Sequence, residues 1–271
     1  MSKMNDFISR FNFHTTPFTC EIGVREHFVH DIYQEPLEQL LDVIDKRMSA
    51  ALIAPAGTGK TAILRSINHK LPQTRYQVHY IKVTDLSKRD FCREIALAVG
   101  AEPAGTYPSL VRRLQERFTN AMDIDGTRIL LMIDEAHDIR PDVLGLLRIL
   151  TNFNMDNRLV VSIVLAGQAP LKKMLQHPKL EDVAHRLALC ASLRLLSRKE
   201  SVLYIKHRCR VAGADTCPFD TSAREAIYEI GRGNLRATDH LALKSLEIAH
   251  KQECDVVDSG HITEARGILW V

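Results

Sequence analysis

Five short runs with the patterns of strands, most of them apolar and the one at residues 77–83 alternating, are spaced along the first two thirds of the chain, and segments with helical spacing lie between them. The runs predict strands at residues 50–53, 77–83, 128–133, 159–166 and 189–195. The segments predict helices at residues 36–48, 62–71, 87–99, 108–119 and 141–153. Because strands that alternate with helices build parallel sheets covered on both faces, we predict an α/β fold with a parallel five-stranded sheet.

The pattern changes at Ser197, after which only helical periodicity is found. Ser197 and Glu200 have the spacing of a capping box, which marks a helix start. We therefore divide the chain into an N-terminal arm (1–33), an α/β core (34–196) and a small α-helical lid (197–271). We expect the arm to pack on the domain through its phenylalanines, which are Phe7, Phe11, Phe13, Phe18 and Phe28.

A glycine-rich sequence, APAGTGKT, begins at Ala54 directly after the first predicted strand. It matches the phosphate loop G-x-x-x-x-G-K-[ST], except that Ala54 stands at the first glycine. Gly57 and Gly59 allow backbone amides to turn inward around a phosphate chain. Lys60 places a charge near the outer phosphates, and Thr61 offers a hydroxyl to Mg²⁺. Ala54 lies where the strand ends, and a small residue fits there without a positive φ.

The context of this loop distinguishes a nucleotide site from an ordinary glycine-rich turn. An apolar strand precedes the loop, and a helix that stops at Pro72 follows it. The N-terminus of such a helix adds its dipole and its free amides to an anion site. We predict that the loop binds ATP. The residues expected to contact the nucleotide are Pro55, Ala56, Gly57, Thr58, Gly59, Lys60, Thr61 and Ala62.

Two adjacent carboxylates, Asp134 and Glu135, end the third predicted strand. In a parallel sheet, the carboxyl ends of the strands meet at one edge, so the acids and the loop are expected to lie together. Asp134 would hold Mg²⁺ through water, and Glu135 would polarise the attacking water. His137 completes the tetrapeptide DEAH. A helicase with that box needs a second motor core, for which the lid leaves no room.

Three further polar residues occupy positions from which they can reach a nucleotide. Gln168 follows the fourth strand, where it can sense the γ-phosphate or simply begin a helix. Arg186 precedes the last strand, from which a guanidinium would reach a neighbouring subunit's nucleotide. Arg236 opens a lid helix and could reach back to the phosphates. Spacing alone leaves both arginines equally consistent with surface ion pairs.

Composition excludes several other classes of protein. The chain has 271 residues, is 45% hydrophobic and carries a net charge of +3, which is compatible with nucleic acid without indicating it. Six scattered cysteines without a C-x-x-C pair predict neither a zinc site nor a disulfide framework. Because the chain has neither a signal peptide nor an apolar run of membrane length, we expect a cytoplasmic protein without membrane contact.

With these elements in this order, the chain resembles an AAA+ ATPase over nearly its whole length. More narrowly, it is similar to the ExeA-type ATPases and to the related transposition helpers of the TnsC, MuB and IstB kind. The stretches that carry the resemblance are the F-x₃-P-F arm from Phe13, APAGTGKT, LLMIDEAH, VLAGQAPL from Val164, Arg186 with LRLLSRKE from Leu193, and Gly231-x₄-Arg236.

The resemblance implies a role for each of the three polar residues. Gln168 would be sensor 1, Arg186 an arginine finger acting in trans within a ring or helical filament of identical subunits, and Arg236 sensor 2. The chain departs from the family pattern at Ala54 and at residues 233–236, which read Gly-Asn-Leu-Arg where the family often has Gly-x-Pro-Arg. Neither departure removes a ligand, so ATP and Mg²⁺ remain the expected cofactors.

The resemblance leaves the process that the ATPase drives open. In secretion-type relatives, a membrane segment and a cell-wall-binding part follow the ATPase, whereas this sequence stops at Val271. An ATPase without these added parts is similar to the helpers of integrase-type transposases. Such helpers polymerise on duplex DNA with ATP and recruit the transposase, and a targeting protein can be a further partner. The alternatives are a secretion or cell-envelope assembly ATPase acting through protein partners, and a regulator that binds ATP without DNA.

Two predicted helix starts carry residues suited to duplex DNA. In similar helpers, these elements face the DNA in the lumen of a filament, and phosphate contacts give affinity without sequence choice. The same residues also fit solvated helix faces. We expect the protein to hydrolyse ATP weakly by itself and faster when DNA or a partner protein stimulates it. The residues are Lys88, Arg89, Thr106, Ser109, Arg112 and Arg113.

Overall fold

The computed structural model describes residues 6–82, 85–153 and 158–270, which form two compact units. The core unit comprises residues 31–55 and 60–193. The helical unit comprises the residues up to 30, residues 56–59 and the residues from 194 onward. The centre of the glycine-rich loop therefore groups with the helical unit, whereas the strand before it and the helix after it belong to the core unit.

The core unit contains a five-stranded sheet in the order β2-β3-β4-β1-β5, and each neighbouring pair of strands is parallel. The predicted α/β fold with a parallel five-stranded sheet is confirmed. The register aligns the carboxyl ends of the strands, since Ile53 of β1 pairs with Gly167 of β4 and Lys82 of β2 pairs with Asp134 of β3. The strands are β1 (Ser49–Ile53), β2 (Tyr76–Lys82), β3 (Arg128–Asp134), β4 (Val161–Gly167) and β5 (Leu187–Ser192).

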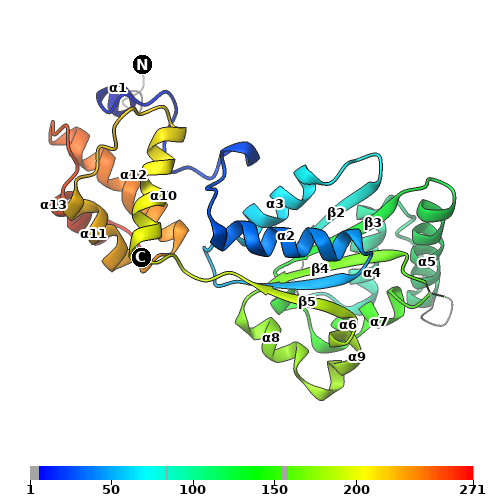
Figure 1. The fold of residues 1–271 in the computed structure, drawn as a ribbon. Helices are drawn as coiled ribbons and strands as arrows, with labels where there is room; N and C mark the ends of the chain where they lie inside the picture. Colours follow the sequence, from blue (N-terminus) through cyan, green and yellow to red (C-terminus); the bar gives the residue numbers. More distant parts are fainter. Residues whose placement is uncertain (1–5, 83–84, 154–157, 271) are drawn as a thin grey trace. The chain divides into compact units, whose positions relative to one another are not determined.

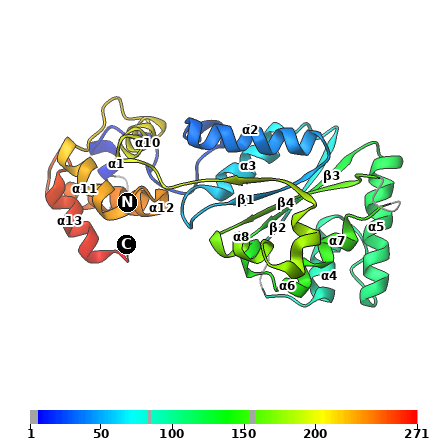
Figure 2. The ribbon, with the colours of Figure 1, turned by 60° about the horizontal axis from the view of Figure 1, so that its bottom comes forward.

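Helices cover both faces of this sheet. Figures 1 and 2 show α2 and α3 on one face and α4 to α8 on the other. The second face buries one continuous apolar cluster, in which Phe91, Leu114 and Leu131 are fully enclosed. The helices of the core unit are α2 (Asp31–Asp45), α3 (Lys60–Lys70), α4 (Lys88–Ala98), α5 (Tyr107–Asp123), α6 (Pro141–Leu144), α7 (Leu146–Leu150), α8 (Ala169–Leu175) and α9 (Glu181–Ala184).

Some of the predicted helices differ from the structure. The apolar spacing predicts the first helix from Pro36, but α2 begins at Asp31, because burial of Ile32 and Tyr33 extends the helix ahead of the proline. The helix predicted at residues 141–153 is two short helices, with Gly145, a poor residue for a helix interior, between them. Helix α8 begins directly after Gln168, as one of the two interpretations of that residue predicts. Helix α9 has no counterpart in the prediction, and residue 83 of the second predicted strand lies outside the described residues.

The described part of the helical unit consists of four longer helices and the N-terminal segment. Ser197 caps α10 and forms the predicted capping box with Glu200. Four of the five N-terminal phenylalanines are buried in the apolar cluster of this unit, where Phe18 packs edge-on against Phe219 at 5.7 Å between ring centroids. The elements are α1 (Asp6–Arg10), a 3-10 turn (Val24–Glu26), α10 (Arg198–Val211), α11 (Thr221–Gly231), α12 (Leu235–Lys251) and α13 (Ser259–Ile268).

Among the described residues, no helix combines the length and the apolar character needed to cross a membrane.

Candidate nucleotide-binding site

The glycine-rich loop adopts the backbone expected of a phosphate loop. Positive φ values occur at Gly57 (71°) and Gly59 (96°), while Ala54 is not among the residues with positive φ. Ala54 is fully buried, and its N–H donates to the carbonyl of Gly167 on the neighbouring strand at 2.9 Å. An alanine therefore serves at this position because the chain still follows the sheet there, and the sharp turn comes later, at the glycines.

Lys60 and Thr61 begin α3 and meet the carboxylates at the end of β3. The Lys60 ammonium lies 2.9 Å from Glu135 Oε2 and 3.5 Å from Asp134 Oδ1. The Thr61 hydroxyl donates to Asp134 Oδ2 at 3.3 Å. Lys60 and Asp134 are both buried, so their charges are compensated where water does not screen them. The structure thus brings together the four residues that the sequence predicted for the phosphates, the metal and the attacking water.

Glu135 has an unusual backbone at the point where β3 ends. Its φ of 53° lies in the left-handed region, and its N–H donates to Asp134 Oδ1 at 2.8 Å. Non-glycine residues adopt this conformation at a cost that the surrounding structure must offset, and such residues are concentrated at functional sites. The turn directs two successive carboxylates toward Lys60.

Tyr80 is a member of the site that the sequence did not reveal. Its hydroxyl donates to Asp134 Oδ2 at 2.9 Å, from the strand next to β3. Burial, followed by the hydrogen bond to Asp134, raises the pKa of Tyr80 to about 12. An ordinary tyrosine is already protonated at neutral pH, and the raised pKa keeps the phenol a hydrogen-bond donor at alkaline pH as well. The alternation of β2 gave no signal for this contact, which depends on the pairing of β2 with β3.

The donor set fits a magnesium ion. Mg²⁺ prefers oxygen ligands and binds nucleotides through one or two protein oxygens together with the phosphates. Thr61 presents a hydroxyl and Asp134 a carboxylate, and the two groups are in contact. Tyr80, on the neighbouring strand, orients the same carboxylate through its hydrogen bond. Thr61 and Asp134 are the residues that would hold the metal.

Gln168 lies at the carboxyl end of β4, beside the strand that leads into the loop. Its Nε2 is 2.9 Å from His137 Nε2, and His137 Nδ1 is 3.3 Å from Glu135 Oε2. His137 therefore lies between Gln168 and Glu135, in contact with Gln168 through Nε2 and close to Glu135 through Nδ1, which makes no hydrogen bond to the described residues. Sequence reasoning gave His137 no role except in the rejected helicase interpretation.

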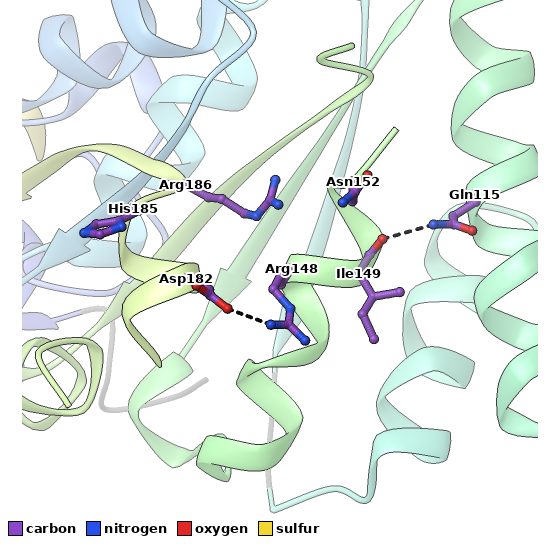
Figure 3. Close-up of a pocket in the computed structure, with 7 residues that line it drawn as sticks. All are labelled: Gln115, Arg148, Ile149, Asn152, Asp182, His185 and Arg186. Atoms are coloured by element: carbon purple, nitrogen blue, oxygen red, sulfur yellow. Dashed lines mark hydrogen bonds and ion pairs between the residues drawn. The ribbon is translucent and has the colours of Figure 1, made fainter. Parts of the chain in front are cut away.

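Arg186 occupies the turn between α9 and β5 and lines a cavity of about 850 Å³. Figure 3 shows its side chain directed into this cavity, whereas His185 points away from Arg186. Arg148 also lines the cavity and pairs with Asp182 at 2.6 Å. None of Lys60, Asp134 and Glu135 lines it, so the cavity and the carboxylate cluster are separate features of the core unit.

Arg236 is the second residue of α12. Its backbone N–H lies 3.3 Å from the carbonyl oxygen of Gly57, which belongs to the same unit. The structure thus places the start of α12 against the centre of the phosphate loop.

The six residues predicted to contact DNA lie at the starts of α4 and α5, and several of their charges are already paired. Arg89 donates to the carbonyl of Gly105 at 3.2 Å, and Arg113 pairs with Glu102 at 3.1 Å. Lys88 lies 3.9 Å from Asp142, and Arg112 lies 3.9 Å from Glu116. Thr106 caps α5 without a side-chain hydrogen bond, and Ser109 packs beside Gly105.

The sheet order and the glycine-rich loop together have the fold of a P-loop NTPase domain of the AAA type. A family model described as AAA domain matches residues 44–175. The chain is 28% identical over 260 residues to general secretion pathway protein A of Aeromonas hydrophila. That match covers 94% of this chain but 47% of the relative, so the chain spans about half the length of the curated relative.

Several solved structures have the same fold over most of this chain. Cdc6p of Pyrobaculum aerophilum aligns with a TM-score of 0.75 at 16% identity, covering 93% of this chain and 70% of that one. Aeropyrum pernix ORC1 in complex with DNA aligns with a TM-score of 0.71 at 17% identity, covering 94% of this chain and 69% of that one. The Thermotoga maritima RuvB Holliday junction branch migration motor aligns with a TM-score of 0.62 at 19% identity, covering 94% of this chain and 72% of that one. At these identities the likeness concerns the fold alone.

Proposed function

We propose that this protein hydrolyses ATP, and the pairing of Lys60 with Asp134 and Glu135 is the observation that supports it. Lys60 would bind the outer phosphates. Thr61 and Asp134 would hold Mg²⁺, which neutralises charge that develops on the phosphate oxygens. Glu135 would orient and polarise the attacking water. Its left-handed backbone and its N–H bond to Asp134 set the direction of the carboxylate in advance.

The contact between Lys60 and Glu135 also suggests how hydrolysis is timed. While the Glu135 carboxylate contacts the Lys60 ammonium at 2.9 Å, it is not available to orient a water molecule. Phosphate oxygens compete with Glu135 for Lys60, so the arrival of ATP would release the carboxylate for the water. The position of His137 between Glu135 and Gln168 gives the sensor-1 residue a route to the same carboxylate.

A site completed by a second copy of the chain accounts for Arg186. The guanidinium points into a cavity that the carboxylate cluster does not line, so Arg186 would act on a neighbouring subunit's ATP. An arginine supplied in trans stabilises the charge of the transition state. This arrangement makes the active form an oligomer, either a ring or a helical filament, with Arg236 as the sensor-2 residue within each subunit.

Duplex DNA is the first candidate for the partner of this oligomer. Of the cations at the starts of α4 and α5, the Arg112 side chain is 75% exposed and that of Lys88 is 45% exposed, each at the edge of ion-pair distance from an acid. Such weak surface pairs exchange readily for phosphates. In this function the protein would select DNA targets for an integrase-type transposase, and a targeting protein would be a further partner.

A second candidate is assembly of a secretion or cell-envelope apparatus through protein partners. The observation that favours it is the 28% identity to general secretion pathway protein A over 94% of this chain. The proposed ATP chemistry is the same in both functions, and the difference is whether DNA or protein stimulates it.

Electron microscopy with a non-hydrolysable ATP analogue distinguishes the two candidates. The protein is imaged with and without linear duplex DNA, at low and at moderate salt, with Lys60→Ala as the matched variant that should not assemble. Rings or filaments that need nucleotide and follow the DNA support the transposition function. Assemblies that ignore DNA at every salt concentration contradict it and favour the secretion-type function.

A further inference from the structure

The start of α12 makes three hydrogen bonds to carbonyl oxygens of the phosphate loop. The Asn234 side-chain amide donates to the carbonyl of Ala56 at 2.7 Å. The backbone N–H groups of Leu235 and Arg236 donate to the carbonyl of Gly57 at 2.9 and 3.3 Å. All of these residues belong to the helical unit, which explains why the loop centre groups with that unit.

These bonds determine where the loop's N–H groups point. A trans peptide is planar, so the N–H of each residue points opposite to the carbonyl of the residue before it. With the carbonyls of Ala56 and Gly57 bonded to α12, the N–H groups of Gly57 and Thr58 point away from α12. Successive N–H groups on one side of a loop form an anion-binding nest.

The approach of Asn234 to the loop requires glycine at position 57. A Cβ added there would lie 2.3 Å from Asn234 Oδ1, and the φ of Gly57 is already positive. Asn234 is itself fixed, since its Oδ1 caps α12 by accepting from the N–H of Ala237 at 3.1 Å. Just before it, the carbonyl of Gly233 accepts from the N–H of Leu196 at 3.0 Å. The helix start is therefore a rigid support for the loop.

We propose that the Asn234 side chain and the Leu235 N–H are positioning groups for phosphate binding. They hold two loop carbonyls outward so that the amides of Gly57 and Thr58 face the phosphates. This inference rests on the proposed binding of ATP. By linkage, a nucleotide that favours this loop geometry also favours the docked start of α12, and with it the position of Arg236.

Two substitutions remove these donors while keeping the helix start. Proline is well suited to the first position of a helix, and Asn234 has the extended backbone (φ −77°, ψ 122°) that a following proline requires, so Leu235→Pro removes only one N–H. Asn234→Asp keeps a good cap but cannot donate to Ala56. Thr221→Pro, at the first position of α11, is the matched proline control.

The experiment measures binding of a fluorescent ATP analogue with Mg²⁺, and its competition by tripolyphosphate, which has no base or ribose. We expect Leu235→Pro and Asn234→Asp each to weaken both ligands by about tenfold, the effect of losing one well-placed hydrogen bond. Leu235→Ala, which keeps the N–H, should recover most of the affinity lost in Leu235→Pro. Thermal unfolding and circular dichroism verify that each variant is folded.

The outcomes separate this inference from the proposed function. Wild-type protein that binds ATP, together with Leu235→Pro and Asn234→Asp variants that bind both ligands within about twofold of it, would overturn the positioning role alone. A loss for ATP without a loss for tripolyphosphate would overturn it as well. If the wild-type protein does not bind ATP, the proposed function fails, and this inference fails with it.

Discussion

The hydroxyl of Tyr80 on β2 donates to Asp134 Oδ2 at the end of β3, at 2.9 Å, and the Thr61 hydroxyl donates to the same oxygen at 3.3 Å. The carboxylate expected to hold Mg²⁺ is therefore oriented from two sides. Removing a group that orients a metal-binding side chain in this way commonly changes the affinity for the metal.

Tyr80→Phe removes one of these two donors and should weaken the magnesium dependence of ATP hydrolysis. We expect the Mg²⁺ concentration for half-maximal hydrolysis to rise by about tenfold, with a smaller change in the maximal rate. Titrating Mg²⁺ at a fixed ATP concentration measures the Mg²⁺ concentration needed for half-maximal hydrolysis. Tyr76→Phe, on the same strand but bonded to Asp45, is the control and should behave as wild type. An unchanged requirement in Tyr80→Phe would show that Asp134 does not need this donor.

Arg186 can be tested by mixing two inactive variants. Arg186→Ala keeps its own ATP site, and Glu135→Gln binds ATP and still offers Arg186 to a neighbour. In random oligomers of an equal mixture, about one interface in four joins a competent site to an intact finger, so about a quarter of the wild-type rate should return. A mixture no more active than its components would contradict action in trans.

Glu200 should make the helical unit sensitive to acid. Hydrogen bonds from Arg194, then from Ser197, lower the pKa of Glu200 to about 2. Because the folded pKa lies below the unfolded value, this stabilisation is complete above about pH 4.5 and is lost as the pH falls toward 2. Glu200→Gln should lower the unfolding free energy at pH 7 by about 1.5–3 kcal/mol and flatten its loss in acid.

Chemical denaturation between about pH 2 and pH 7 measures that difference. His30 lies 3.7 Å from Glu200 and is another titratable group facing it, so the comparison is repeated in a His30→Gln background. Equal acid sensitivity of wild type and Glu200→Gln in both backgrounds would contradict the assignment.

The DNA interpretation predicts a change in salt dependence. Removing Lys88 and Arg112 together should weaken binding to duplex DNA without regard to sequence, and reduce the slope of log affinity against log salt by about two. Lys46→Ala, on the loop after α2 and paired with Asp42, is a control with similar exposure. Fluorescence anisotropy over a salt series measures the slope, and an unchanged slope would remove these two residues from the DNA interface.

The sequence predicted those parts of the site that follow from strand order. Parallel strands end at one edge, so the meeting of Lys60 with Asp134 and Glu135 could be foreseen from the motif and the apolar strand. Gln168 could be placed beside the loop for the same reason. These predictions need only the topology of the sheet, which alternating strands and helices indicate well.

The contacts that escaped prediction depend on the geometry between distant side chains. Tyr80 meets Asp134 only because β2 pairs with β3 in one register, and Asn234 meets Ala56 across 178 positions of the chain. Helix α2 extends ahead of Pro36 because Ile32 and Tyr33 continue the apolar spacing of Leu37 and Leu40, whereas the prediction gave more weight to the proline, a common first residue of helices.

The most direct test of the proposed ATP chemistry is steady-state hydrolysis by Glu135→Gln alongside its ATP affinity. We predict that turnover falls by about 100-fold or more while the affinity stays within about threefold, because the amide cannot polarise the water but leaves the phosphate contacts intact. Glu94→Gln, an exposed acid on α4, should behave as wild type. Normal turnover in Glu135→Gln would contradict the role of this residue and the account built on it.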